Sequence, residues 1–252
     1  MQPERIPNRE KLILAGLYLS KYDSAGLKKL GFGSFVEAYN VIGYALGARP
    51  ASIKNYRDEF DPLFPNRRKG WHNRATREYC LQVYHEYKGL DLDSFTALIK
   101  SFVGYDENLW SEVRPKAQEE DGESLFAKRL TTGLAAEHYF EAVQPRLAEF
   151  REYTLENTTR LGCGFDFRLR KETRPGFLAV EVKGMKEEKG SVSLTPKEYE
   201  VATALADRFY LFVVKNFRKS PFHEIYQNPL VGSLSFTKKE RVMVHVSWLT
   251  TV

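Results

Sequence analysis

The unbroken apolar run from Phe209 to Val214 is the feature that most constrains how this chain folds. A short continuous apolar segment of this kind is typical of a strand that lies in the middle of a sheet and is buried on both faces. Two stretches before it, 165–169 and 178–182, alternate apolar and polar residues as half-buried strands do, and a further alternation covers 242–248. With a helix expected over 124–143, the chain is predicted to be an α/β protein built around a mixed sheet.

The segment before the apolar run begins with a capping box, which predicts a helix over 195–207. Thr195 is a preferred N-cap residue, Pro196 occupies the first helical position, and Glu198 stands three residues after the cap. The resulting order of helix, strand, strand, helix and strand describes a mixed-sheet domain.

Helical periodicity runs from about residue 9 to residue 103, with interruptions at Gly, Pro and Asp turns. We therefore expect an all-helical N-terminal domain over 1–105. The polar stretch over 106–123 carries no sustained periodicity and is the predicted linker, and the sheet domain is expected over 124–252. The 252 residues, 42% of them apolar and 28% charged, are an ordinary composition for a globular protein of one or two domains.

The formal net charge of +5 arises between Arg49 and Arg77. That segment holds eight basic and three acidic residues, so the rest of the chain sums to zero. A concentration of positive charge on this scale favours a face that binds a polyanion. A solvated basic surface without a partner is the alternative.

Within the basic segment, a helix that ends near Gly47, a turn with Pro50 and a second helix resemble a helix-turn-helix motif. In such a motif the second helix enters the major groove of DNA, where its polar residues meet base edges, and the basic loop after it would contact phosphates. The predicted DNA-binding residues are Ser52, Lys54, Asn55, Arg57, Arg67, Arg68, Lys69 and Arg74. A helical domain that serves only dimerisation is the alternative.

Three charged residues, Asp166, Glu181 and Lys183, interrupt the two alternating strands. Burying an unpaired charge is costly, so something must compensate these groups. Glu181 and Lys183 are two residues apart and therefore share one face of their strand, and Asp166 can reach the same place from a neighbouring strand. Two carboxylates close together repel each other unless a cation lies between them, and carboxylate oxygens with room for water suit Mg²⁺.

A lysine beside such a metal can orient or deprotonate a water molecule and can stabilise charge on a phosphate. This combination favours phosphodiester hydrolysis. The Glu-x-Lys spacing alone is weak, since Glu187 and Lys189 have it too, but those two residues fall in a polar loop. A buried structural ion pair is the alternative for the trio.

The stretches GCGFDFRL, LAVEVKG, SVSLTPKEYEVA and RFYLFVV together resemble the PD-(D/E)xK nuclease superfamily. More narrowly, they are similar to the nuclease-like domain at the C terminus of NO VEIN proteins, which also occurs in bacterial restriction and defence proteins. The resemblance covers about residues 130–217. It implies that Asp166 and Glu181 are metal ligands and that Lys183 is the catalytic lysine. Glu137 matches a further acidic position of the superfamily, whereas Phe165 stands where a proline often precedes the aspartate.

We therefore expect a magnesium-dependent DNA endonuclease, specifically a restriction enzyme of a bacterial defence system that resembles the type II enzymes. Because both strands of double-stranded DNA need cutting and each chain carries one site, a homodimer is expected. The main alternative is a DNA-binding protein whose nuclease-like fold does not cleave. An RNA-directed or modification-dependent nuclease is a third possibility.

Neither a signal peptide nor an apolar span of membrane length is evident, so we expect a cytoplasmic protein that has no membrane partner. The two cysteines, Cys80 and Cys163, lie far apart and have no Cys or His cluster around them. This spacing indicates neither a zinc site nor a disulfide framework.

Overall fold

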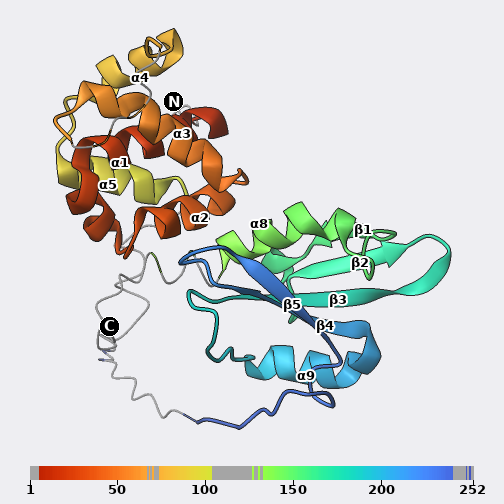
Figure 1. Ribbon diagram of the computed structural model, residues 1–252. Helices are drawn as coiled ribbons and strands as arrows, with labels where there is room; N and C mark the ends of the chain where they lie inside the picture. The colour runs from red at the N-terminus through yellow and green to blue at the C-terminus, as the bar shows by residue number, and fades with distance from the viewer. Residues whose placement is uncertain are drawn as a thin grey trace.

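The computed structural model describes residues 6–66, 68, 70, 74–103, 127, 130, 133–240, 248 and 250. These residues form a group of helices that lies beside a sheet with helices on both of its faces (Figure 1). The helices of the N-terminal group are α1 (Asn8–Leu30), α2 (Phe35–Ala45), α3 (Pro50–Phe60), α4 (Glu78–Tyr87) and α5 (Leu92–Ser101).

Within the described residues, the sheet has five strands in the order β1-β2-β3-β4-β5. They are β1 (Thr154–Asn157), β2 (Phe167–Lys171), β3 (Arg174–Gly184), β4 (Phe209–Lys215) and β5 (Phe222–Gln227). Strands β3 and β4 are parallel, and the other neighbours are antiparallel. The expected α/β architecture with a mixed sheet is therefore confirmed. The strand expected over 242–248 falls, except for Trp248, outside the described residues.

Strand β4 is covered on both faces, as its apolar run predicts. On one face, Phe212 and Val180 pack with the core beneath α8 (Leu134–Val143). On the other face, Phe209 packs with Ala179 and with Ala202 of α9 (Pro196–Leu205). Figure 1 shows the two helices on opposite sides of the sheet. Because β3 and β4 run parallel, the chain needs a crossover between them, and α9 supplies it.

The capping box at the start of α9 is confirmed. Thr195 Oγ1 accepts a hydrogen bond from the Glu198 N–H at 3.3 Å, and Glu198 Oε2 accepts one from the Thr195 N–H at 3.0 Å. The helix ends at Leu205, two residues before the expected end, because Ala206 adopts a positive φ of 47° and a 3-10 turn follows. The helix expected over 124–143 is described as α8 only from residue 134 onward.

Glu59 and Asp61 are buried acidic residues of the helical group that pair with nearby basic residues. Glu59 has 1% of its side chain exposed and pairs with Arg74 and Arg77. Arg77 also donates its backbone N–H to Glu59 Oε1 at 2.8 Å. Asp61, whose side chain is fully buried, accepts hydrogen bonds from Ser20 Oγ at 2.7 Å and from Arg68 Nη2 at 2.8 Å. Several positive charges of this segment are therefore paired with buried acids.

Acid should destabilise the protein through Glu59. Burial alone would raise the pKa of Glu59, but hydrogen bonds from Arg77 and Arg74 hold that pKa at about 2. A carboxyl whose pKa is lowered by folding stabilises the fold above its unfolded pKa, and this stabilisation is lost as the pH falls through the folded pKa. Between about pH 5 and about pH 2, the free energy of unfolding should therefore fall by about 2 kcal/mol more in the wild type than in Glu59→Gln. Urea denaturation measures this difference, and equal acid dependence would contradict the assignment.

The helical group packs directly against the sheet part of the chain. Asn40 of α2 donates its side-chain amide to the carbonyls of Phe217 at 2.8 Å and of Lys219 at 3.0 Å. His138 Nδ1 of α8 donates to the carbonyl of Tyr44 at 3.0 Å. The buried apolar residues of the two parts form one continuous cluster. The linker expected over 106–123 lies outside the described residues, so the domain boundaries remain a prediction.

Among the helices that the structure describes, none combines the length and the apolarity that crossing a membrane would require.

Candidate active site

Strand β3 places Glu181 and Lys183 on the face of the sheet that α9 covers. Both share this face with Ala179, which packs against α9, because side chains two residues apart point the same way. Lys183 Nζ donates a hydrogen bond to Glu181 Oε1 at 2.5 Å, and the Glu181 side chain is only 4% exposed. The predicted juxtaposition of these two charges is therefore present.

Asp166 joins them, but it lies just before β2 and not inside a strand. Its backbone N–H donates to the carbonyl of Val180 at 3.1 Å, and its Oδ2 accepts a hydrogen bond from the Val182 N–H at 2.9 Å. Strand β2 begins at Phe167, opposite Val180, so the Val182 N–H lies beyond the first residue of β2 and has no partner in that strand. The Asp166 carboxylate accepts the Val182 N–H at the point where the hydrogen-bond ladder between β2 and β3 has ended. The expectation that Asp166 lies within a strand was therefore wrong.

The loop before Asp166 is shaped by Gly164 and Thr158. Gly164 has a φ of +87°, and a Cβ at this position would lie 2.9 Å from Val201 and 3.2 Å from the carbonyl of Lys197. A larger residue would therefore be strained and would collide with α9. Thr158 Oγ1 donates to the carbonyl of Asp166 at 3.0 Å, and the Thr158 N–H donates to the same oxygen at 2.8 Å. These contacts hold Asp166 at the end of the sheet.

Glu198 is a member of the site that reasoning from the sequence missed. Lys183 Nζ donates to Glu198 Oε2 at 2.8 Å, and the same oxygen accepts the Thr195 N–H. The capping box therefore ties the first turn of α9 to the lysine on β3. A signal was available, since the helix that follows the Glu-x-Lys strand begins with an acid on its first turn. The sequence explained this acid fully as a cap, and nothing local indicated a second partner.

Glu137, on α8, lies within the electrostatic field of the site. Its pKa is raised to about 7, first by burial and then by the negative charges of Asp166 and Glu141, while Lys183 acts in the opposite direction. Whether Glu137 contacts a metal stays a prediction.

The site holds more carboxyl groups than cationic groups. Burial, and then the neighbouring Asp166, raise the pKa of Glu181 to about 8. Burial also raises the pKa of Asp166. Burial alone would lower the pKa of Lys183, but Glu181 and Glu198 outweigh it, so this pKa lies above its ordinary value. One ammonium group faces several carboxylates, and an additional cation would relieve their repulsion.

The carboxylates do not form a closed metal cage. Within the described part of the chain, no three His, Cys, Asp or Glu side chains are spaced so that they could hold a metal ion together. The carboxylates of the site instead suit a metal ion that binds one or two carboxylates and keeps several water ligands, as Mg²⁺ does. Asp166 and Glu181 supply hard oxygen donors of that kind, whereas a zinc site would need nitrogen or sulfur ligands.

An open pocket of about 230 Å³ gives access to this cluster. Its walls are the loop over 159–166 and the first turn of α9. The residues that line it are Thr159, Gly162, Gly164, Phe165, Asp166, Glu181, Thr195, Lys197 and Glu198. Two of the three predicted catalytic residues therefore face open space, and the third contacts both Glu181 and Glu198 from within.

The family model described as Protein NO VEIN, C-terminal, matches residues 135–227. The match covers 93 of the 252 residues and runs from α8 to the end of β5. It includes Glu137, Asp166, Glu181, Lys183 and Glu198, so the whole acidic cluster lies within the NO VEIN C-terminal match. No curated protein and no solved structure matches the chain.

The predicted DNA-binding residues lie outside the NO VEIN C-terminal match, in α3 and the loop after it. Lys54 and Asn55 are exposed on α3, and Ser52 is partly exposed. Lys54 forms an ion pair with Asp58 at 3.0 Å. Arg57 is only 12% exposed, pairs with Asp58 at 2.9 Å and lies over the ring of Phe35. On the surface of α3, a ligand can therefore reach Ser52, Lys54 and Asn55 more easily than Arg57.

The described arginines of the basic loop are paired with acidic residues. Arg68 donates to Asp61 through Nε and Nη2 and pairs with Asp23 at 2.7 Å, and Arg74 pairs with Glu59 at 3.2 Å. Arg67 and Lys69 lie outside the described residues. None of the described members of this set lines the acidic pocket. They belong to the helical group, whose helix α2 packs against α8 (Figure 1).

Proposed function

We propose that this protein is a magnesium-dependent endonuclease that hydrolyses phosphodiester bonds in double-stranded DNA. The observation that carries the proposal is the convergence of Asp166, Glu181 and Lys183 at the edge of an open pocket with an excess of carboxylates. The match of the NO VEIN C-terminal model over the same segment and the resemblance to PD-(D/E)xK nucleases support it.

In this proposal Asp166 and Glu181 hold the metal together with water molecules. When bound, Mg²⁺ would polarise the phosphoryl oxygen and lower the pKa of a bound water. Lys183 stays protonated, because Glu181 and Glu198 raise its pKa. We therefore assign it the role of a charged hydrogen-bond donor to the attacking water or to the phosphate, and not that of a base. Glu198 restrains the direction in which Lys183 points.

The proposal that the substrate is DNA depends on the helical group. A helix-turn-helix arrangement with exposed polar residues on α3 and a basic segment around it suits the phosphates and base edges of a duplex. A restriction role in bacterial defence and a homodimer that cuts both strands extend this proposal.

A catalytically silent DNA-binding protein is the second candidate. The observation that favours it is that Lys183 already makes ion pairs with Glu181 and Glu198, as a purely structural lysine would. The open pocket beside the pair favours the enzyme instead, because a structural ion pair needs no access to solvent.

The deciding experiment is incubation of the purified protein with plasmid DNA and Mg²⁺, followed by sequencing of the ends. Discrete ends would support a restriction enzyme, and intact plasmid would support the silent DNA-binding protein. Parallel reactions with methylated duplex and with RNA distinguish a modification-dependent or RNA-directed nuclease from the proposed one.

Divalent metal should stabilise the wild type but not Glu181→Gln. A ligand that binds only the folded state adds about 2.7 kcal/mol at 100 times its Kd, which is a shift of several degrees in Tm. Ca²⁺ is a suitable probe in thermal denaturation, since it takes the same oxygen ligands as Mg²⁺.

Without metal, we expect Glu181→Gln to be more stable than the wild type at high pH. The pKa of Glu181 is raised by folding, so its ionisation destabilises the fold as the pH rises through about 8. At about pH 9 in a chelator, Glu181→Gln should therefore unfold at a higher temperature than the wild type. A metal-induced shift of equal size in both proteins would rule out Glu181 as a ligand.

A further inference from the structure

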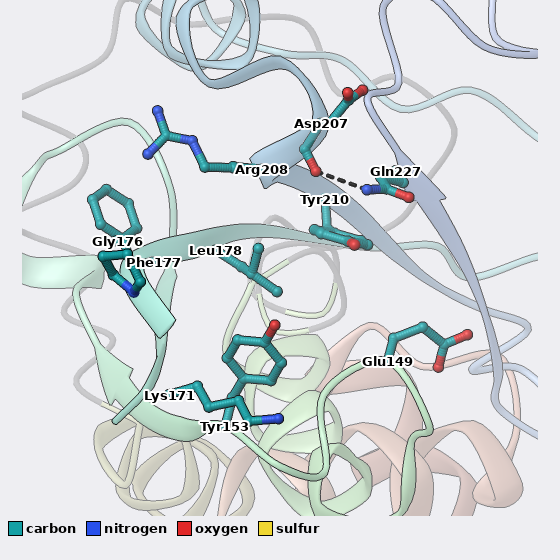
Figure 2. Close-up of a pocket in the computed structure, with 11 residues that line it drawn as sticks. Glu149, Tyr153, Lys171, Gly176, Phe177, Leu178, Asp207, Arg208, Tyr210 and Gln227 are labelled. Atoms are coloured by element: carbon teal, nitrogen blue, oxygen red, sulfur yellow. Dashed lines mark hydrogen bonds between the residues drawn. The ribbon is translucent and has the colours of Figure 1, made fainter. Parts of the chain in front are cut away.

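A second pocket of about 180 Å³ opens where β3 and β4 begin. Figure 2 shows Leu178 in the middle of this site, with the hydroxyl of Tyr153 directed toward it and Tyr210 beside it. The pocket lies between these strands and the loop after α8. It shares no lining residue with the acidic pocket.

The walls of this second pocket include aromatic rings that pack against the buried core. The ring of Tyr210 meets the fully buried ring of Phe150 edge-on, with their centroids 5.1 Å apart. Tyr153 and Leu178 are partly buried and pack against the main core. A flat ligand entering here would meet apolar surface that is already in position, which lowers the cost of binding.

Two charged groups at the rim are not engaged elsewhere. Among the described residues, Glu149 and Arg208 make no hydrogen bond or ion pair, and both side chains are exposed. Other polar groups of the lining are occupied: Lys171 pairs with Glu152, and Asp207 Oδ1 accepts a hydrogen bond from Asn228 at 2.9 Å. The rim therefore presents one carboxylate acceptor and one guanidinium donor to a ligand.

A glycine of β3 lies next to the Arg208 side chain. Gly176 has a φ of +89°, and a Cβ there would lie 3.7 Å from Arg208 Nη1. The guanidinium group thus lies above a backbone position that carries no side chain.

The size of the pocket suits a single ring system. Pockets for drug-sized ligands measure about 300–1,000 Å³, and this pocket, at about 180 Å³, is smaller. Aromatic walls, an acceptor and a planar donor together suit a flat heterocycle that both donates and accepts hydrogen bonds. Nucleobases are heterocycles of this chemistry, and proteins hold them by stacking and by hydrogen bonds to their edges.

We propose that the pocket formed by Tyr153, Leu178 and Tyr210, with Glu149 and Arg208 at its rim, binds a nucleobase. The base comes either from a free nucleotide or from a nucleic acid strand in which it is unstacked. The second source rests on the proposed function. Leu178 and Glu181 point to opposite faces of the sheet, so a strand that reaches both pockets has to pass around the end of the sheet.

The test uses the full chain with nucleoside monophosphates and with single-stranded oligonucleotides that contain 2-aminopurine, whose fluorescence is quenched when it stacks. A chelator prevents any cleavage. Arg208→Ala and Glu149→Gln are the test variants, and both change exposed side chains that the fold does not need. Arg151→Ala is the matched control, because Arg151 is exposed nearby but does not line the pocket.

Loss of a charge-assisted hydrogen bond should weaken binding about tenfold or more in either test variant and leave the control unchanged. If the effect appears with free nucleotides, the pocket binds a free nucleotide; if it appears only with oligonucleotides, the pocket binds an unstacked base. No saturable binding, or equal affinity in all variants, would overturn the proposal.

The same experiment separates this proposal from the nuclease proposal. Lys183→Ala should keep the quenching, because Lys183 is not part of this pocket. If the wild type binds the base but cuts no DNA in Mg²⁺, only the nuclease proposal fails; if it cuts DNA but does not bind the base, only the base-binding proposal fails.

Discussion

Lys183→Ala should lower the rate of phosphodiester cleavage by about 1,000-fold or more while DNA binding stays nearly unchanged. The Lys183 ammonium is the one cation in contact with Glu181 among the described residues, and it lies beside the pocket where a phosphate would enter. A charged donor aimed at a developing charge in a site of this kind contributes a factor of about 100–1,000, and loss of water orientation adds to it. Plasmid cleavage in Mg²⁺ measures the rate, and a gel-shift assay in Ca²⁺ measures binding.

The chain offers a matched control in Lys189→Ala. Glu187 and Lys189 repeat the Glu-x-Lys spacing, but they are exposed in a loop after β3, and Glu187 pairs with Arg218 instead. This variant should cleave like the wild type. Lys183→Met keeps the apolar stem and tests whether Ala fails only through loss of packing. Undiminished cutting by both Lys183 variants would show that the trio is a structural ion pair.

Phe140→Ala should lower the free energy of unfolding by about 3–5 kcal/mol, the largest stability effect that we expect from one substitution. Phe140 of α8 is fully buried. Its ring centroid lies 5.0 Å from that of Phe167 in β2, 4.8 Å from that of Phe212 in β4, and 5.8 Å from that of Phe150. Removing the ring leaves a cavity among three aromatic side chains that belong to different elements and cannot all close in.

Urea denaturation followed by circular dichroism measures this effect. The matched control is Tyr199→Ala, which removes a ring of α9 that is 46% exposed, and it should cost well under half as much. Because α8 also carries Glu137, we expect Phe140→Ala to reduce cleavage as well. If Phe140→Ala and Tyr199→Ala cost the same, the packing of α8 on the sheet is not as described.

Local patterns were enough to predict the central elements of the sheet part. The apolar run from Phe209 to Val214 predicted a central strand, and the capping box at Thr195 predicted where α9 begins. The two-residue spacing of Glu181 and Lys183 predicted that they share a face. Each of these properties depends on residues that are close in sequence, so a short segment carries the whole signal.

The edge strands could not be predicted in the same way. Strand β1 is four residues long, and three of them are exposed, so it shows no apolar alternation. Strand β5 is half-buried along most of its length. Both segments become strands because a neighbouring strand offers free N–H and C=O groups, which is a property of the partner and not of the segment.

The partners of charged side chains were also beyond the sequence. Arg57, Arg68 and Arg74 belong to the basic segment that favours a DNA-binding face, but the buried Asp61 and Glu59 hold Arg68 and Arg74. The number of these charges can be read from the sequence. The sequence could not show that the acids among them are buried, because burial of Glu59 depends on how α3 packs against α1.

The sequence by itself determined which segments are helices and central strands, and it determined that Glu181 and Lys183 stand side by side on one of them. The tertiary structure alone decided that Asp166 caps the free end of the β2–β3 ladder and that Glu198 reaches Lys183 across the crossover. The physical reason is range: periodicity and capping act over a few residues, whereas the contacts that assemble the acidic pocket join residues up to 16 positions apart that only the folded sheet brings together.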